Sequence, residues 1–126
     1  MKRQVVATDA APKAVGPYSQ AVWAGDLLFC AGQIPLEPAT GNIVAGGITE
    51  QTTQVLENIR GLLQSQDLDF KNVVKSTVFL SDMNNFTAMN EIYARFFTKE
   101  PPARSTVQVA RLPKDALVEI EVVATR

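Results

Sequence analysis

The side chains that could carry chemistry in this 126-residue chain lie mainly in its last quarter. Arg104 opens a β-rich segment, and Glu119 and Glu121 stand two residues apart in another. A guanidinium can hold a carboxylate through two parallel hydrogen bonds. Two carboxylates spaced in this way lie roughly 6.6 Å apart along a strand, a separation that also suits paired acid–base chemistry, as in a glycosidase. A solvated sheet face, with an ion pair from Arg104 to either glutamate, is the simpler interpretation.

The chain has no histidine and one cysteine, which excludes histidine-dependent catalysis, multi-cysteine metal sites and an intramolecular disulfide framework. Cys30 is predicted to be a small buried residue, because no histidine is present to activate its thiol. We expect no metal and no organic cofactor. Gly16-Pro17-Tyr18 predicts a turn that projects a tyrosine, and Gly32-Gln33 ends a strand, where backbone N–H groups can meet an anion.

The charge of the chain is close to balanced, with 12 Lys+Arg, 13 Asp+Glu and a formal net charge of −1. This balance removes the main electrostatic argument for a nucleic-acid partner. The length and the 46% hydrophobic composition predict a single domain over 1–126. No secretory signal is recognisable, and no apolar run reaches the roughly 18 residues that span a bilayer. We therefore expect a cytoplasmic protein without a membrane partner, with an organelle such as the mitochondrion left open.

Apolar periodicity predicts two helices, from Thr49 to about Gln66 and from about Asp82 to Thr98. Thr49 and Asp82 are the expected N-caps. β-rich segments supply the predicted strands: 4–7, 20–23, 27–31, 72–80, 103–109 and 117–125. The order β-β-β-α-β-α-β-β is not a strict βαβ alternation. It favours an α+β fold in which two helices cover one face of a mixed six-stranded sheet.

Alternation along the last two strands predicts how their side chains are shared between the faces of the sheet. Val118, Ile120, Val122 and Ala124 form an apolar face suited to packing against the helices. The other face is predicted to carry Arg104 together with Glu119 and Glu121, among apolar residues. Two helices cannot cover this second face as well, so we expect another subunit to cover it.

Five longer segments carry a resemblance to a known family: GPYSQA (16–21), CAGQIP (30–35), VVKSTVFLSDMNNF (73–86), NEIYARFF (90–97) and PPARSTVQVARLPKDALVEIEVVA (101–124). Together they closely resemble the reactive intermediate/imine deaminase family (RidA, YjgF-like), in order and across essentially the whole chain. The resemblance implies a chorismate-mutase-like fold and a homotrimer with its sites between subunits. It also implies hydrolysis of 2-enamine/2-imine intermediates, such as 2-aminoacrylate/2-iminopropanoate, to 2-keto acids and ammonia.

The resemblance also assigns roles to individual residues. Arg104 is implied to hold the substrate carboxylate and Glu119 to position water, with Tyr18 as a third catalytic residue. Substrate-binding positions fall on Gly32, Asn90, Arg104 and Thr106. Many members have a cysteine where this chain has Thr106, and many have a serine where it has Ala31, so a role for that thiol is absent here. No cofactor is implied.

Three other functions compete with an imine deaminase. A trimeric module that only binds small 2-keto or 2-amino acids would use the same arginine. An RNA-directed nuclease, an activity also attributed to some members, is disfavoured by the near-neutral charge and the absence of histidine. A chorismate mutase on the shared fold is disfavoured by the linked motifs.

Overall fold

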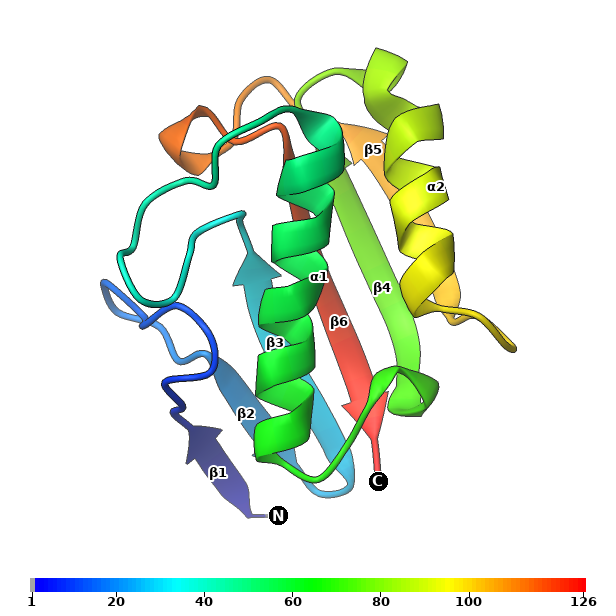
Figure 1. Ribbon diagram of the computed structural model, residues 1–126. Helices are drawn as coiled ribbons and strands as arrows, with labels where there is room; N and C mark the ends of the chain where they lie inside the picture. Colours follow the sequence, from blue (N-terminus) through cyan, green and yellow to red (C-terminus); the bar gives the residue numbers. More distant parts are fainter. Residues whose placement is uncertain (1) are drawn as a thin grey trace.

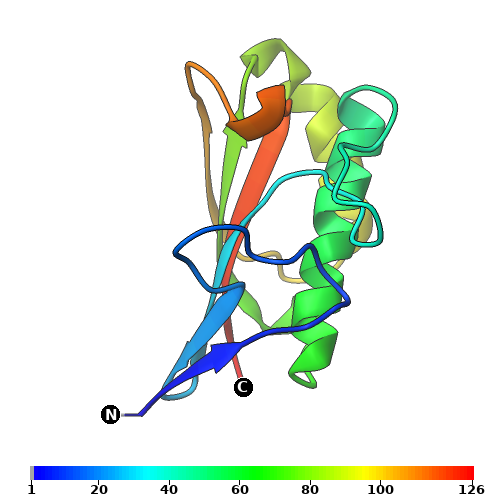
Figure 2. The same ribbon diagram turned by 90° about the vertical axis from the view of Figure 1, so that its left-hand side faces the viewer.

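The computed structural model describes residues 2–126, which form one six-stranded sheet with two α-helices on one of its faces (Figures 1 and 2). The elements follow the predicted order and are β1 (Arg3–Val6), β2 (Ala21–Ala24), β3 (Leu27–Gln33), α1 (Ile48–Ser65), β4 (Val73–Leu80), α2 (Phe86–Phe96), β5 (Ala103–Gln108) and β6 (Val118–Thr125). Within residues 2–126, neither helix combines the length and apolar character that crossing a membrane requires. The mixed sheet with two helices on one face confirms the predicted α+β architecture.

The strands are ordered β1-β2-β3-β6-β4-β5 across the sheet. All neighbours are antiparallel except β4 and β5, which run parallel. A parallel pair needs a crossover connection, and α2 supplies it. The last strand, β6, is inserted between β3 and β4 (Figure 1). As a result, the β6 side chains lie near the middle of the sheet, whereas β5 forms one edge.

Helix α1 buries the predicted apolar stripe against the sheet, and its five apolar residues are fully enclosed: Val55, Leu56, Ile59, Leu62 and Leu63. The N-cap prediction was wrong. Helix α1 begins at Ile48 with Gly47 as its N-cap, and Thr49 lies inside the first turn. The cause is Glu50, whose Oε1 accepts a hydrogen bond from the Gly47 N–H at 2.8 Å and satisfies a donor that the helix leaves free.

Helix α2 follows a short 3₁₀ turn over Met83–Asn85. Asp82, the predicted N-cap of the helix, caps this turn instead, because its Oδ1 accepts a hydrogen bond from the Asn84 N–H at 2.9 Å, and the N-cap of α2 is Asn85. The helix ends at Phe96, two residues before the predicted end. Met89 and Tyr93 point into the core.

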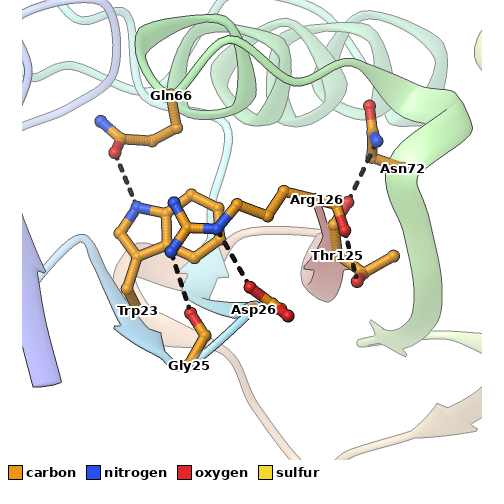
Figure 3. A network of polar contacts seen from close by, with 7 residues as sticks. All are labelled: Trp23, Gly25, Asp26, Gln66, Asn72, Thr125 and Arg126. Carbon is orange, nitrogen blue, oxygen red and sulfur yellow. Dashed lines mark hydrogen bonds and ion pairs between the residues drawn. The ribbon is translucent and has the colours of Figure 1, made fainter. Parts of the chain in front are cut away.

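The C-terminal residue is fastened to the β2–β3 hairpin (Figure 3). The guanidinium of Arg126 lies 4.3 Å from the centre of the Trp23 ring and donates to the Asp26 carboxylate at 3.3 Å and the Gly25 carbonyl at 3.2 Å. The Trp23 indole N–H in turn donates to the Gln66 side chain, just after α1, at 2.7 Å. These contacts join the end of β6 to the hairpin and to the end of α1.

No helix of residues 2–126 covers the face of the sheet turned away from α1 and α2, which is called the open face here (Figure 2). It mixes apolar and acidic side chains: Leu27, Phe29, Thr77, Phe79, Val107, Glu119, Glu121 and Val123. Phe29 is 46% exposed and lies in a cross-strand row with Val5, Val22 and Val123, and Val107 is 43% exposed on the edge strand β5, beside Phe79. An exposed apolar row of this kind is unusual on a sheet that faces water. The open face therefore resembles a surface made for contact with another protein.

Candidate functional site

A cavity of about 450 Å³ brings together three of the predicted site residues: Tyr18, Gly32 and Glu119. Gly32 lies near the end of β3 and Glu119 near the start of β6, so two neighbouring strands place them side by side. Three loops complete the walls, over 12–18, 34–36 and 113–114. The walls are mostly apolar, with a few polar groups, which is the usual make-up of a small-molecule site.

The carboxylate of Glu119 lies directly over Gly32. A Cβ atom placed on Gly32 would fall 2.9 Å from the Glu119 Cδ and closer still to its Oε2, so a residue with a side chain would collide with the carboxylate. The β3–β6 register also shifts between Cys30 and Gln33, where the backbone departs from regular pairing. The absence of a side chain at position 32 therefore leaves the space that the Glu119 carboxylate occupies.

Burial raises the pKa of Glu119 above its ordinary value, and the negative charge of Glu121 raises it further. The two carboxylates lie on the same face of β6, as predicted. Glu121 is exposed, whereas Glu119 is half-buried in the cavity wall. Glu119 is therefore the carboxylate better suited to moving a proton near neutral pH.

Tyr18 projects from a turn, as predicted. Gly16 has a φ of 128°, a conformation that favours glycine, and its carbonyl accepts a hydrogen bond from the Tyr18 N–H at 2.9 Å. Tyr18 is 53% exposed at the rim of the cavity. Its hydroxyl accepts a hydrogen bond from the Val15 N–H at 3.4 Å, which leaves the hydroxyl proton for a ligand that enters there.

Arg104 does not lie in this cavity, and the prediction that placed it on the same face as Glu119 and Glu121 was wrong. Arg104 pairs with Ser76 in the β4–β5 ladder, and Ser76 points to the helix-covered face. Strand β4 separates β5 from β6, so neither glutamate lies next to Arg104. The expected alternative, an Arg104–glutamate ion pair, is absent among the described residues.

Helix α2 gives Arg104 its surroundings. The Arg104 Nη1 donates to the Asn90 Oδ1 at 2.8 Å, and the guanidinium carbon lies 4.7 Å from the centre of the Tyr93 ring and 5.7 Å from that of Phe86. An arginine stem packs readily on aromatic rings, which explains why β5 turns this residue toward the helix. Arg104 and Asn90, both predicted binding residues, thus form a second group.

Thr106 belongs to the same side of the sheet as Arg104, because it pairs with Val78 in the ladder. Its Oγ1 is buried and has no hydrogen-bond partner within residues 2–126. The predicted site residues therefore divide into a carboxylate group (Tyr18, Gly32 and Glu119) and an arginine group (Asn90, Arg104 and Thr106), which lie on opposite faces of one sheet.

Cys30 is buried, as predicted, and burial raises the pKa of its thiol to about 12. A thiol with such a pKa stays protonated near neutral pH and is a poor nucleophile. No three His, Cys, Asp or Glu side chains gather as a metal site anywhere in residues 2–126.

Two lysines in the cavity wall were not singled out from the sequence. Lys13 and Lys114 both line the cavity with Glu119. Each directly follows a proline, Pro12 or Pro113, a local signal that could have marked them as held at loop positions. Lys114 also has a φ of 55°, a left-handed conformation that is uncommon for lysine.

Comparisons with known proteins agree along almost the whole chain. The family model described as Endoribonuclease L-PSP matches residues 8–126. A RutC family protein of Pyrococcus horikoshii is 54% identical over 97% of this chain and 97% of its own length. A mouse protein named 2-iminobutanoate/2-iminopropanoate deaminase is 46% identical over 98% of this chain and 92% of its own length.

Solved structures give the same result for the fold. The crystal structure of E. coli TdcF with bound serine superposes with a TM-score of 0.93 at 43% identity and covers 98% of each chain. The two chains therefore share the fold over almost their whole length. On the motifs, the fold and these relatives together, the chain belongs to the reactive intermediate/imine deaminase (RidA, YjgF-like) family, whose family model carries the description Endoribonuclease L-PSP.

Proposed function

We propose that this protein hydrolyses reactive 2-enamine/2-imine acids, such as 2-aminoacrylate/2-iminopropanoate, to 2-keto acids and ammonia. The observation that carries the proposal is a half-buried carboxylate, Glu119, with a raised pKa inside an apolar cavity. A 2-imino acid already has an electrophilic C=N carbon, so its hydrolysis needs only an anchor, a placed water and a path for protons. The name of the mouse relative supports the same reaction.

The reaction follows from the roles of three residues. The Arg104 guanidinium holds the substrate carboxylate in a bidentate pair, and Asn90 keeps the guanidinium oriented. Glu119 positions a water whose oxygen adds to the C=N carbon. The proton that Glu119 takes from this water passes to the nitrogen, which gives a carbinolamine. The proton of its new hydroxyl then also passes to the nitrogen, the C–N bond breaks, and ammonia leaves as the carbonyl forms. Tyr18, at the cavity rim, is placed to donate a hydrogen bond along this path.

One chain cannot assemble this site alone, because Arg104 and Glu119 lie on opposite faces of its sheet. A second copy must bring its arginine group to the carboxylate group of the first. The open face is suited to this contact, because it carries the exposed apolar residues Phe29 and Val107 as well as Glu119 and Glu121. We therefore propose a homotrimer with sites between neighbouring subunits, which is the assembly that the family resemblance implies.

Imine hydrolysis is tested by a coupled assay. A serine dehydratase generates 2-aminoacrylate, and decay of the enamine/imine is followed with and without this protein. We expect catalysed decay to 2-keto acid and ammonia, unchanged by a metal chelator. A protein that binds 2-keto acids but leaves the decay at its spontaneous rate would be a binding module instead, and the proposed activity would be wrong.

The assembly is tested by light scattering at micromolar concentration. We expect three times the 13.7 kDa chain mass. Placing a charge on the open face, by Phe29→Asp, should dissociate the trimer and abolish hydrolysis, because the two groups of the site then separate. An exposed residue of helix α1, on the other side of the sheet, supplies the control: Gln64→Asp should leave the trimer intact. A monomer mass for the wild-type protein in light scattering would contradict the shared site.

A further inference from the structure

Three buried amide side chains, Gln20, Gln51 and Asn58, each bond to the backbone of a different segment at the cavity. All three are at most 6% exposed. Removing an amide from water is costly unless its polar atoms find partners. An apolar residue would fill the same space without that requirement. The amides are explained by their hydrogen bonds to the backbone of the segments at the cavity.

Gln20 fastens the first segment. Its Oε1 accepts a hydrogen bond from the Thr8 N–H at 2.6 Å, and its Nε2 donates to the Pro12 carbonyl at 2.7 Å. Pro12 and the adjoining Lys13 line the cavity. One side chain at the start of β2 therefore fixes the loop that leads to the Tyr18 turn.

Asn58 fastens the second segment from α1. Its Nδ2 donates to the Leu36 carbonyl at 2.9 Å and to the Ile34 carbonyl at 3.3 Å. Its Oδ1 accepts a hydrogen bond from the Gln54 side chain at 2.9 Å, so both ends of the amide are used. Ile34 and Leu36 are themselves part of the apolar cavity wall.

Gln51, two turns before Asn58 on α1, fastens the third segment. Its Oε1 accepts a hydrogen bond from the Leu117 N–H at 2.8 Å. The Leu117 carbonyl accepts another from the Ser81 N–H at 3.1 Å, so both backbone polar groups of Leu117 are bonded. Leu117 directly precedes β6, and Glu119 follows two residues later. In Figure 1 the three segments gather beside α1.

We propose that Gln51 and Asn58 are positioning residues of the imine site: through the backbone, and without touching substrate, they set the 34–36 wall and the Glu119 carboxylate. Gln20, which itself lines the cavity, holds the remaining wall. This inference rests on the proposed function for its catalytic consequence. Its structural content, the restraint of Leu117 and of the 34–36 segment, can be measured without any activity.

The first test is Gln51→Met, which keeps a similar shape and removes the acceptor for the Leu117 N–H. A misplacement of about 1 Å can lower a rate by about 10²-fold. We expect kcat to fall about 10- to 100-fold and KM to stay within about threefold. Gln51→Glu keeps an acceptor oxygen at the same reach and should recover most of kcat. Should Gln51→Met fail to fold, Gln51→Asn, whose shorter side chain cannot reach Leu117, takes its place.

Asn58→Leu is the second test, and Thr52→Val is the matched control for both. Thr52 is buried on the same helix, but its Oγ1 has no hydrogen-bond partner within residues 2–126. Its removal therefore breaks no hydrogen bond to a loop. Asn58→Leu should lower kcat/KM at least about tenfold, because the 34–36 wall loosens. Thr52→Val should leave both kinetic constants unchanged. Melting temperatures establish that each variant is folded.

Hydrogen exchange separates this inference from the proposed function. The Leu117 amide should exchange at least about tenfold faster in Gln51→Met and at the wild-type rate in Thr52→Val. Faster exchange with wild-type kinetics would overturn the positioning role, and so would unchanged exchange. A wild-type protein that hydrolyses no imine would instead overturn the proposed function, and the exchange result would then decide the restraint by itself.

Discussion

Replacing Arg104 with alanine should lower kcat/KM for a 2-imino acid by about 30- to 1000-fold while the protein stays folded and assembled. The expected loss corresponds to about 2–4 kcal/mol, the value of a charge-assisted bidentate contact in a partly buried site. In the proposed site this contact is the one that holds the substrate carboxylate. Steady-state kinetics on dehydratase-generated imine, with light scattering on the same sample, measure both results.

Arg104→Lys should recover little of the activity. Lysine keeps the positive charge, but its ammonium lacks the planar fork that meets both oxygens of a carboxylate. It also loses the donor geometry that Asn90 now accepts at 2.8 Å and the flat surface that lies 4.7 Å from the Tyr93 ring centre. Recovery of most activity by lysine would mean that charge alone suffices and that the bidentate contact is wrong.

Arg60→Ala is the matched control. Arg60 is also an arginine over two aromatic rings, with its guanidinium carbon 5.6 Å from the Phe70 centre and 5.1 Å from the Phe96 centre, and it lies on α1 away from the cavity. Its removal takes away comparable cation–π packing, worth about 0.5–1 kcal/mol at an exposed site. Activity should survive in Arg60→Ala. Equal losses in the two variants would show that Arg104 serves packing and not substrate binding.

The helices and strands of this fold could be predicted because the spacing of apolar residues along the sequence depends only on local structure. The α1 stripe repeats at spacings of one, three and four residues, and these residues are buried as that pattern indicates. The alternation in β6 likewise placed Glu119 and Glu121 on the face away from the helices. The burial of Cys30 was predicted from composition, because the chain has no histidine that could activate its thiol.

The position of Arg104 could not be predicted from such patterns. Alternation in β5 shows that Arg104 and Val107 point to opposite faces, but it does not say which face the helices cover. Placing Arg104 on the face of Glu119 and Glu121 turns Val107 toward the helices, whereas Val107 is 43% exposed on the open face. The actual choice depends on α2, whose Tyr93 and Asn90 accommodate the arginine stem and guanidinium. Insertion of β6 beside β4 is also a long-range pairing, which no local signal encodes.

Replacing Glu119 with glutamine should lower kcat by roughly 10²- to 10⁴-fold, the usual contribution of a positioned acid–base group. The amide has the same shape but cannot take a proton from water. Binding of a 2-keto acid product should remain nearly unchanged, because the carboxylate of that product meets Arg104. Single-turnover kinetics and product titration separate the two effects. Weakened product binding with a normal kcat would assign Glu119 to binding instead.

Glu121→Gln is the matched control, since Glu121 lies on the same face of the same strand but outside the cavity. Its kcat should stay close to that of the wild type. The negative charge of Glu121 helps to raise the pKa of Glu119, so its removal should move the acid limb of the kcat profile to lower pH. The charged groups on the other side of Glu119 are Lys13 and Lys114 in the cavity wall, and they are unchanged in this variant.

Stability should move in the opposite direction from activity at Glu119. Its pKa is raised in the folded protein, so the folded state binds this proton more tightly than the unfolded chain does. Ionisation of Glu119 therefore destabilises the fold as the pH rises through the raised pKa. Glutamine carries no charge to desolvate, so Glu119→Gln should melt at or above the wild-type temperature at neutral pH while its turnover falls. A residue kept for an ion pair would give the reverse, a lower melting temperature with activity falling only as the protein unfolds.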